Sequence, residues 1–331
     1  MHTVILNPNV IEDLNKASDI LKSGGLVVLP TETVYGLAAD MFSQEAFKSI
    51  FLVKERSSSK VLTVHISEFS QIKTLTDNLC INTKKLIKNF WPGPLTIIVK
   101  SSSKVPEYVT SGAGYVGIRF PKNNTFKDVT DLVGNPLVAT SANRSGSFSA
   151  TKFEQVFGEF NGKVDAIFKE QKGKILGLES TIVSFKEEVP KILRLGSISH
   201  EEIKSVIGNI KLETKNSSKK CNKKVVAVDA TPEDFSDYIN SRQNLNIALL
   251  CFNEDANLLL ERRGLKVVTM GTENDLRGLV YNFYESLRKL DNVISKEDII
   301  YIHLPKKEGL GLSLYKKLLE LFSFREINLQ D

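Results

Sequence analysis

The sequence predicts two α/β domains, with a mixed sheet in the first and a smaller parallel, Rossmann-like sheet in the second. Short apolar runs rich in β-branched residues alternate with helical periodicity along the chain. A lysine-rich segment without periodicity interrupts this pattern, and regular strand–helix alternation follows it. We therefore expect domains at 1–209 and 225–331, joined by a linker at 210–224.

Composition limits the class of protein. The chain has 331 residues, more than one hydrophobic core usually organises, with 41% apolar and 25% charged residues. No apolar stretch is long enough to span a membrane and the N-terminal segment carries acids, so we expect a cytoplasmic protein without a signal peptide. Cys80, Cys221 and Cys251 are far apart, which predicts reduced thiols and no cysteine zinc site. The net charge of +5 permits an anionic ligand or RNA without requiring either.

The strands of the first domain are predicted from apolar runs at 26–29, 61–66, 95–100, 116–120, 136–140, 180–185 and 191–195. Helical periodicity covers 43–55, where Ser43 is a suitable N-cap, and 80–90. Several strands follow one another without a helix between them. This order predicts a mixed sheet rather than repeated parallel βαβ units.

The second domain alternates more regularly. Strand patterns at 225–229, 246–252, 266–271 and 299–305 are each followed by a helical pattern, at 232–241, 254–263, 273–290 and 312–324. This alternation is typical of a small parallel sheet. The first strand and its loop lack the G-x-G-x-x-G motif, so nothing here indicates a dinucleotide site.

The first polar group follows a strand in LPTETVYGLAAD, residues 29–40. Thr31, Glu32, Thr33 and Tyr35 enter a turn closed by Gly36. Hydroxyls, a carboxylate and a phenol in one place suit recognition of a small polar molecule. The alternative is a turn whose side chains satisfy only its own backbone.

The second polar group is VKERSSSKVLTVH, residues 53–65. Lys54 and Arg56 end a predicted helix, where cations also stabilise the helix dipole, and His65 ends the strand that follows. We expect an anion-binding end and a neutral imidazole on two sides of one cavity. A histidine with a purely structural role remains the alternative.

Two further groups follow later strands. The stretch 136–151 brings Ser141, Asn143 and Ser149 together with small residues, which let backbone N–H groups approach a phosphate or ribose. A loop that only caps the next helix is the alternative. The stretches 177–185 and 191–196 place Ser180 and Arg194 at strand ends, where the arginine fork can bind a phosphate.

Familiar catalytic motifs are absent. No serine lies in a G-x-S-x-G elbow, the histidines are scattered, and the Walker A pattern is missing. The residues alone therefore predict an α/β protein with a polar cavity for a phosphorylated or nucleotide ligand and a small polar one.

In order and spacing these stretches resemble the YrdC-like family, in its two-domain form. The matching motifs are GGLVVLPTETVYGLAAD, KERSSSKVLTVHI, FWPGPLTIIVK, VGIRFP, ATSANRSGSFSAT, GLESTIV and ILRLGSIS, with NDLRGLVYNFYESLRKLD and EGLGLSLYKKLLE in the second domain. The resemblance implies a twisted mixed sheet with flanking helices and a concave basic face, followed by a smaller Rossmann-like domain.

The resemblance also implies an activity, that of an L-threonylcarbamoyl-AMP synthase. Such an enzyme makes threonylcarbamoyl-AMP and pyrophosphate from L-threonine, bicarbonate and ATP, with Mg²⁺ carried by ATP and no tightly bound protein metal site. The product feeds modification of the adenosine beside the anticodon of tRNA, so downstream threonylcarbamoyl-transfer proteins are the implied partners. Contact with tRNA or double-stranded RNA stays open, and no membrane is implied.

Site residues follow from the matching motifs. Lys54 and Arg56 are the implied catalytic residues. The implied threonine pocket consists of Thr33, His65, Arg119 and Ser180. The implied ATP site consists of Lys54, Arg56, Lys60, Ser141, Asn143, Ser149 and Arg194.

The chain departs from the family pattern in three places. Ala139-Thr140 stand where the family more often has a proline before Ser-Ala-Asn. Ser57 and Val61 replace family prolines and Lys60 replaces an asparagine, so we expect a more mobile loop. The segment 210–224 lacks the Pro-Gly and His-Tyr-Ala-Pro stretches that form a lid over ATP in the longer form. Two alternatives to the synthase activity stay open. The first is an RNA-binding or accessory protein with little turnover, and the second is a carbamoyl-transfer relative that uses carbamoyl phosphate.

Overall fold

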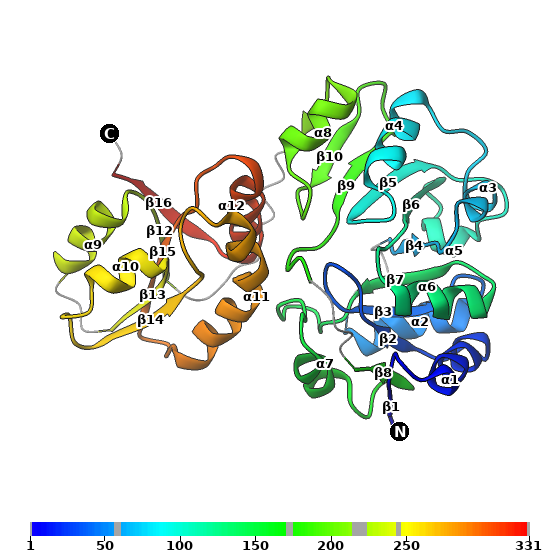
Figure 1. The fold of residues 1–331 in the computed structure, drawn as a ribbon, viewed down its shortest axis with the longest axis horizontal. Helices are drawn as coiled ribbons and strands as arrows, with labels where there is room; N and C mark the ends of the chain where they lie inside the picture. The colour runs from blue at the N-terminus through cyan, green and yellow to red at the C-terminus, as the bar shows by residue number, and fades with distance from the viewer. Residues whose placement is uncertain (1, 56–60, 170–174, 214–223, 243–245, 330–331) are drawn as a thin grey trace. The chain divides into compact units, whose positions relative to one another are not determined.

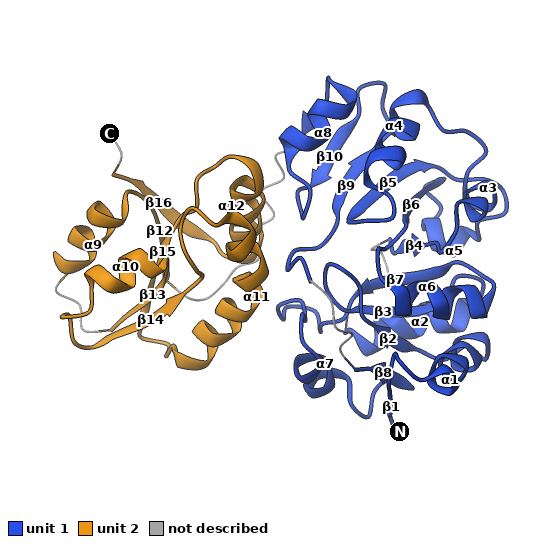
Figure 2. Ribbon diagram, viewed as in Figure 1, with its two compact units in different colours: residues 1–213 blue, residues 214–331 orange. Residues whose placement is uncertain are grey.

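The computed structural model describes residues 2–55, 61–169, 175–213, 224–242 and 246–329. The chain divides into two compact units, Met1–Glu213 and Thr214–Asp331 (Figures 1 and 2). Within the segment that the sequence assigns to a linker, Lys211–Leu212 form strand β11 and Lys224 begins strand β12. Of the same segment, residues 214–223 lie outside the described residues.

Unit 1 alternates strands and helices. Its strands are β1 (Val4–Leu6), β2 (Val27–Leu29), β3 (Gly36–Asp40), β4 (Thr63–His65), β5 (Leu95–Lys100), β6 (Tyr115–Arg119), β7 (Leu137–Ser141), β8 (Ala166–Phe168), β9 (Thr181–Ser184), β10 (Lys191–Arg194) and β11 (Lys211–Leu212). Its helices are α1 (Ile11–Lys22), α2 (Gln44–Val53), α3 (Ile72–Leu75), α4 (Ile81–Phe90), α5 (Glu107–Thr110), α6 (Asn124–Val133), α7 (Phe153–Phe160) and α8 (His200–Ile207), with a 3₁₀ turn, η1, at Phe69–Gln71.

The described strands of unit 1 form one sheet in the order β1-β8-β2-β3-β7-β4-β6-β5-β9-β10-β11. Its centre is mixed, because β3, β7 and β4 pair antiparallel, β4 and β6 parallel, and β6 and β5 antiparallel. The mixed sheet expected from the sequence is confirmed. Because β4, β6 and β5 are neighbouring strands, residues that are distant in sequence lie next to each other in the middle of the sheet.

Helices α1 and α6 pack together against this sheet. Their apolar faces, which include Leu14, Leu21, Phe126 and Val129, are buried with side chains from β1, β2, β3, β7 and β8. Asn123 caps α6 by accepting a hydrogen bond from the Phe126 backbone N–H over 3.0 Å. The resulting core fixes the sheet from which the polar residues of the site project.

Other helix starts follow capping rules readable in the sequence. Ser43 accepts from the Ala46 N–H over 3.3 Å, as its position predicts. Ser199 and Glu202 form a reciprocal capping box at the start of α8. At these helix starts, backbone N–H groups are bonded by side chains of the same helix end.

Unit 2 is regular. Its strands are β12 (Lys224–Asp229), β13 (Ile247–Cys251), β14 (Leu265–Thr269), β15 (Ile299–His303) and β16 (Phe324–Asn328). Its helices are α9 (Pro232–Asn240), α10 (Asn253–Leu258), α11 (Leu276–Val293) and α12 (Gly309–Leu321). Its described strands form a sheet in the order β14-β13-β15-β12-β16, and every pairing is parallel. Helices α9 and α10 lie on one side of it and α11 and α12 on the other (Figure 1), which confirms the predicted parallel sheet.

The structure differs from the sequence pattern at several ends. Gly36, expected to close a turn, begins the buried strand β3, which runs to Asp40 and was not predicted. The last predicted helix ends at Leu321, and β16 begins at Phe324. Helix α10 ends at Leu258, five residues short of the helical pattern that runs to Arg263. No helix among the described residues combines the length and apolar character needed to cross a membrane.

Candidate functional site

Three polar residues form a row across the middle of the first sheet. His65 on β4 pairs with Arg119 on β6, and Arg119 pairs with Thr96 on β5. Directly paired residues project from the same face of a sheet. His65, Arg119 and Thr96 are 5%, 6% and 1% exposed, so the row is a buried polar strip across the sheet.

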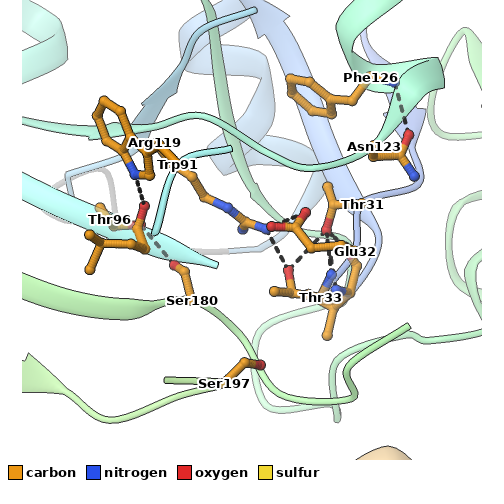
Figure 3. A network of polar contacts seen from close by, with 12 residues as sticks. Thr31, Glu32, Thr33, Trp91, Thr96, Arg119, Asn123, Phe126, Ser180 and Ser197 are labelled. Carbon is orange, nitrogen blue, oxygen red and sulfur yellow. Dashed lines mark hydrogen bonds and ion pairs between the residues drawn. The ribbon is translucent and has the colours of Figure 1, made fainter. Parts of the chain in front are cut away.

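The loop between β2 and β3 crosses this row. The Arg119 guanidinium lies 2.9 Å from Glu32 Oε2 and donates a 2.9 Å hydrogen bond to Thr33 Oγ1 (Figure 3). Thr31 donates to the Val34 carbonyl over 2.6 Å, so the 2.9 Å contact between the two threonine hydroxyls has Thr33 as donor. Thr31 therefore holds the turn, while Glu32 and Thr33 bind the arginine.

Within the described part of the chain, the buried atoms Glu32 Oε1 and Arg119 Nε have no hydrogen-bond partner. Glu32 Oε2 has the ion pair with Arg119 in place of a hydrogen bond. Buried polar atoms in folded proteins normally have a partner, so an acceptor and a donor offered side by side indicate a binding site for a ligand that carries both functions.

A second cluster lies beside the first. Ser180 precedes β9, and its hydroxyl lies 2.7 Å from Thr96 Oγ1 (Figure 3). Arg194, at the end of β10, donates to the Ser180 carbonyl over 3.1 and 2.9 Å and to its hydroxyl over 3.1 Å. The neighbouring Glu179 accepts a 2.7 Å hydrogen bond from Ser149. The cluster therefore brings together Ser180, Arg194 and, through Glu179, Ser149.

The third cluster organises the loop after β7. The Lys54 ammonium donates to the Ser141 carbonyl, to the Asn143 carbonyl over 2.6 Å and, at 3.5 Å, to Asn143 Oδ1. Lys54 is 2% exposed. Ser141 donates to Asn143 Oδ1 over 2.6 Å, and Asn143 donates to the Ser147 carbonyl over 2.7 Å. Lys54 thus binds main-chain oxygens of the loop, where the sequence led us to expect contact with phosphates.

The clusters occupy different places on the sheet. Strand β7 runs antiparallel to β4, so His65 pairs with Leu137, and Ser141 lies at the opposite end of that pairing. At the start of helix α7, the Gln155 side chain accepts hydrogen bonds from the Thr151 and Lys152 N–H groups.

Comparison with known proteins identifies the family. A family model described as telomere recombination, which covers the Sua5, YciO and YrdC proteins, matches residues 19–196. The chain belongs to this family. A second model, described as the C-terminal domain of threonylcarbamoyl-AMP synthase, matches residues 198–319. The resemblance seen in the sequence is confirmed.

Curated members of the Sua5/YciO/YrdC family match nearly the whole chain. Threonylcarbamoyl-AMP synthase of Pyrococcus abyssi is 30% identical over 344 residues, covering 98% of this chain and 99% of the relative. The enzyme of the same name from Bacillus subtilis is 31% identical, covering 94% and 93%. The crystal structure of P. abyssi Sua5 complexed with L-threonine superposes with a TM-score of 0.85 at 26% identity, covering all of both chains.

Some site residues expected from the sequence lie outside the described part of the structure. Arg56 and Lys60 fall within 56–60, as does Ser57 of the loop expected to be mobile. Thr96 was missed, because one threonine in an apolar strand carries no signal without the register of β5 against β6. Among the described residues, no group of three or more His, Cys, Asp or Glu side chains is arranged to hold a metal ion.

His65 is a neutral imidazole. Burial and, to a smaller extent, the Arg119 charge lower its pKa from 6.5 to about 3, although the contact with the Thr63 carbonyl opposes this shift. That contact is 3.0 Å from Nδ1, and because a carbonyl only accepts, Nδ1 carries the proton. Nε2 is therefore left as a hydrogen-bond acceptor on the face of the row.

This pKa predicts a specific pH dependence of stability. Below pH 6.5 the unfolded chain binds a proton at His65 that the folded chain does not, so His65 lowers the free energy of unfolding as the pH falls from 6.5 towards 3. The slope approaches about 1.4 kcal/mol per pH unit. Denaturant unfolding of His65→Gln should lack this component, whereas His2→Gln, at an exposed position, should keep it. Identical pH slopes for wild type and His65→Gln would contradict a buried neutral imidazole.

Proposed function

We propose that this chain is a threonylcarbamoyl-AMP synthase that acts in the threonylcarbamoyl modification of tRNA. The observation that carries the proposal is the match of nearly its full length to synthases of that name, including one crystallised with L-threonine. Its substrates are L-threonine, bicarbonate and Mg²⁺-bound ATP, and its products threonylcarbamoyl-AMP and pyrophosphate. We place it in the cytoplasm, upstream of proteins that transfer the threonylcarbamoyl group to tRNA.

The threonine pocket is assigned to Thr33, His65, Arg119 and Ser180. An amino acid presents a carboxylate and an amino group, which complement Arg119 Nε and Glu32 Oε1, the buried donor and acceptor without partners in the described residues. His65 Nε2 adds an acceptor for the substrate hydroxyl or amine. Glu32 thereby joins the proposed threonine pocket, to which the family resemblance did not assign it.

The ATP site is assigned to Arg194, Ser149, Ser141 and Asn143, with Lys54, Arg56 and Lys60. Arg194 lies directly against Ser180, so nucleotide and amino acid meet at that serine. Lys54 contributes by holding the loop that carries Ser141 and Asn143. The site supplies positioning and positive charge, the main requirements for displacement at phosphorus.

The reaction needs no nucleophile from the protein. The threonine amine and bicarbonate form a carbamate with loss of water. A carbamate oxygen then attacks the α-phosphorus of ATP, the bond to the β-phosphate oxygen breaks, and pyrophosphate leaves. In this scheme Arg119 holds the carboxylate while Arg194 and the remaining cations stabilise the charge on the phosphates.

One assay tests the proposal. The purified chain is incubated with Mg²⁺ and ATP, and pyrophosphate release is followed with threonine and bicarbonate together, singly and absent, with the product identified by mass. We expect release only when both are present. No release under any condition, with retention of tRNA, would favour the accessory RNA-binding alternative, and release that requires carbamoyl phosphate would favour the carbamoyl-transfer alternative.

The assignment of Lys54 predicts an unequal effect on the two substrates. Lys54→Met removes the ammonium from two carbonyls and one amide oxygen, so the Ser141–Asn143 loop loses these three contacts with the residue that follows α2. Hydrogen bonds to charged groups contribute roughly 1.5–3 kcal/mol, so ATP affinity should fall by about 10- to 100-fold. Calorimetry should show threonine affinity within about 2-fold of wild type, and equal losses for both ligands would place Lys54 elsewhere in the mechanism.

A further inference from the structure

The hydroxyl of Thr96 lies between the two halves of the proposed site. Thr96 is the second residue of β5 and pairs with Arg119, which in turn pairs with His65. Its Oγ1 lies 2.7 Å from Ser180 Oγ, and both residues are almost completely buried, at 1% and 2% exposure. Strand β5 also pairs in parallel with β9, and Leu95 lies opposite Thr181. Thr96 follows Leu95 and Ser180 precedes Thr181, so the register of the two strands keeps the two hydroxyls close together.

The number of hydroxyl protons on Thr96 and Ser180 determines which hydrogen bonds they can make with a ligand. Arg194 only donates, so its 3.1 Å contact occupies one acceptor position of Ser180 Oγ. Thr96 and Ser180 carry two hydroxyl protons, and their mutual hydrogen bond uses one of them. The pair therefore presents a single O–H donor, and its partner must be an acceptor such as a carboxylate or carbamate oxygen.

We propose that Thr96 is a positioning residue, which orients the Ser180 hydroxyl for the amino-acid substrate. This inference rests on the proposed function, since the substrate is the threonine assigned to that pocket. Thr96 acts through Ser180 because the 2.7 Å contact fixes the hydroxyl rotor, which otherwise turns freely about its bond. Figure 3 shows Thr96 and Ser180 beside the Arg119, Glu32 and Thr33 cluster.

A double-mutant cycle tests this role. Threonine affinity is measured by calorimetry for wild type, Thr96→Val, Ser180→Ala and the double variant. We expect Thr96→Val to weaken threonine binding about 10-fold, equivalent to about 1.4 kcal/mol, and to leave ATP affinity within about 2-fold. In the Ser180→Ala background the same substitution should have no further effect, because residues that act through one contact are not additive.

Two comparisons separate positioning from general damage. Thr96→Ser keeps the hydroxyl and should return threonine affinity to within about 2-fold of wild type. Thr76→Val removes a buried threonine hydroxyl that donates over 2.8 Å to the carbonyl of Lys100, at the other end of β5, and should not change threonine affinity. If Thr96→Val does not fold, Thr96→Ala replaces it in the same cycle.

Three results would overturn the inference. Equal losses from the Thr96 substitution with and without Ser180 would show independent action, and failure of Thr96→Ser to restore binding would show that the hydroxyl is not the active feature. A wild-type chain that binds no threonine would remove the proposed function as well. Wild-type threonine binding with an additive cycle would remove only the role of Thr96.

Discussion

Glu32→Ala is expected to destabilise the protein and to abolish tight threonine binding. The carboxylate is the charged partner of Arg119, 2.9 Å away, and the side chains are 9% and 7% exposed. Removing one member of a buried ion pair leaves an uncompensated charge and costs about 3–5 kcal/mol. Among the described residues, the Thr33 hydroxyl, a neutral acceptor, then remains as a hydrogen-bond partner of the guanidinium.

Denaturant unfolding and calorimetry measure the two effects. Asp131→Ala is the control, because it breaks the exposed Lys127–Asp131 pair on α6 and should cost no more than about 0.5 kcal/mol. The double variant Glu32→Leu/Arg119→Met replaces both charges by apolar groups and should recover much of the lost stability. It should not recover threonine binding. Wild-type stability for Glu32→Ala, or normal threonine binding by the double variant, would contradict the roles given to this pair.

Local patterns predicted most of the sheet. The runs LTIIVK and KILRL match β5 and β10 within one residue, because buried strands rich in β-branched residues carry a strong local signal. Strand β3 was missed, since its sequence GLAAD contains small residues and an acid that are uncommon in strands. Its five residues are nevertheless buried, because β2 and β7 pair with it on both sides.

The site is harder to predict from the sequence than the strands are, because it depends on which residues of neighbouring strands are paired. The stretch PTET pointed to a polar turn, yet the partner of Glu32 is Arg119, 87 residues later in the chain. Thr96 was recognised as a residue of the site only from the pairing of β5 with β6 and β9. Lys54 was expected to bind phosphates of ATP, and its contacts with carbonyls of the loop after β7 follow from packing that no local pattern encodes.

Gly196→Ala is expected to abolish threonine binding without touching any polar side chain of the pocket. A Cβ at this position would lie 2.1 Å from the Glu179 carbonyl oxygen and 2.7 Å from the Ser180 carbonyl carbon. Both atoms belong to the backbone, and a flexible side chain cannot move away to make room. The strand start that carries Ser180 must therefore shift, and Ser180 must move relative to Thr96 and Arg194.

The size of this shift determines the expected effect. The Gly196 N–H donates to Thr181 Oγ1 over 2.9 Å, and the Ser197 N–H donates to the Glu179 carbonyl over 3.0 Å, so both segments are tied where the clash occurs. Overpacking of this kind costs about 1–3 kcal/mol of stability. Because a Cβ does not approach other atoms within 3.0 Å, the 2.1 Å contact requires a shift of about 1 Å. Such a shift of Ser180 takes the 2.7 and 3.1 Å contacts of its hydroxyl out of hydrogen-bond range.

Threonine affinity should therefore fall by about 100-fold or more, the loss of two hydrogen bonds that include a charged donor. Gly158→Ala is the matched control: it lies in helix α7 with open space around its Cβ, and alanine there should stabilise the helix by up to about 1 kcal/mol. Calorimetry with threonine and thermal unfolding of both variants decide the outcome. A Gly196→Ala protein that binds threonine as tightly as the Gly158→Ala protein would show that the position of Ser180 does not control the pocket.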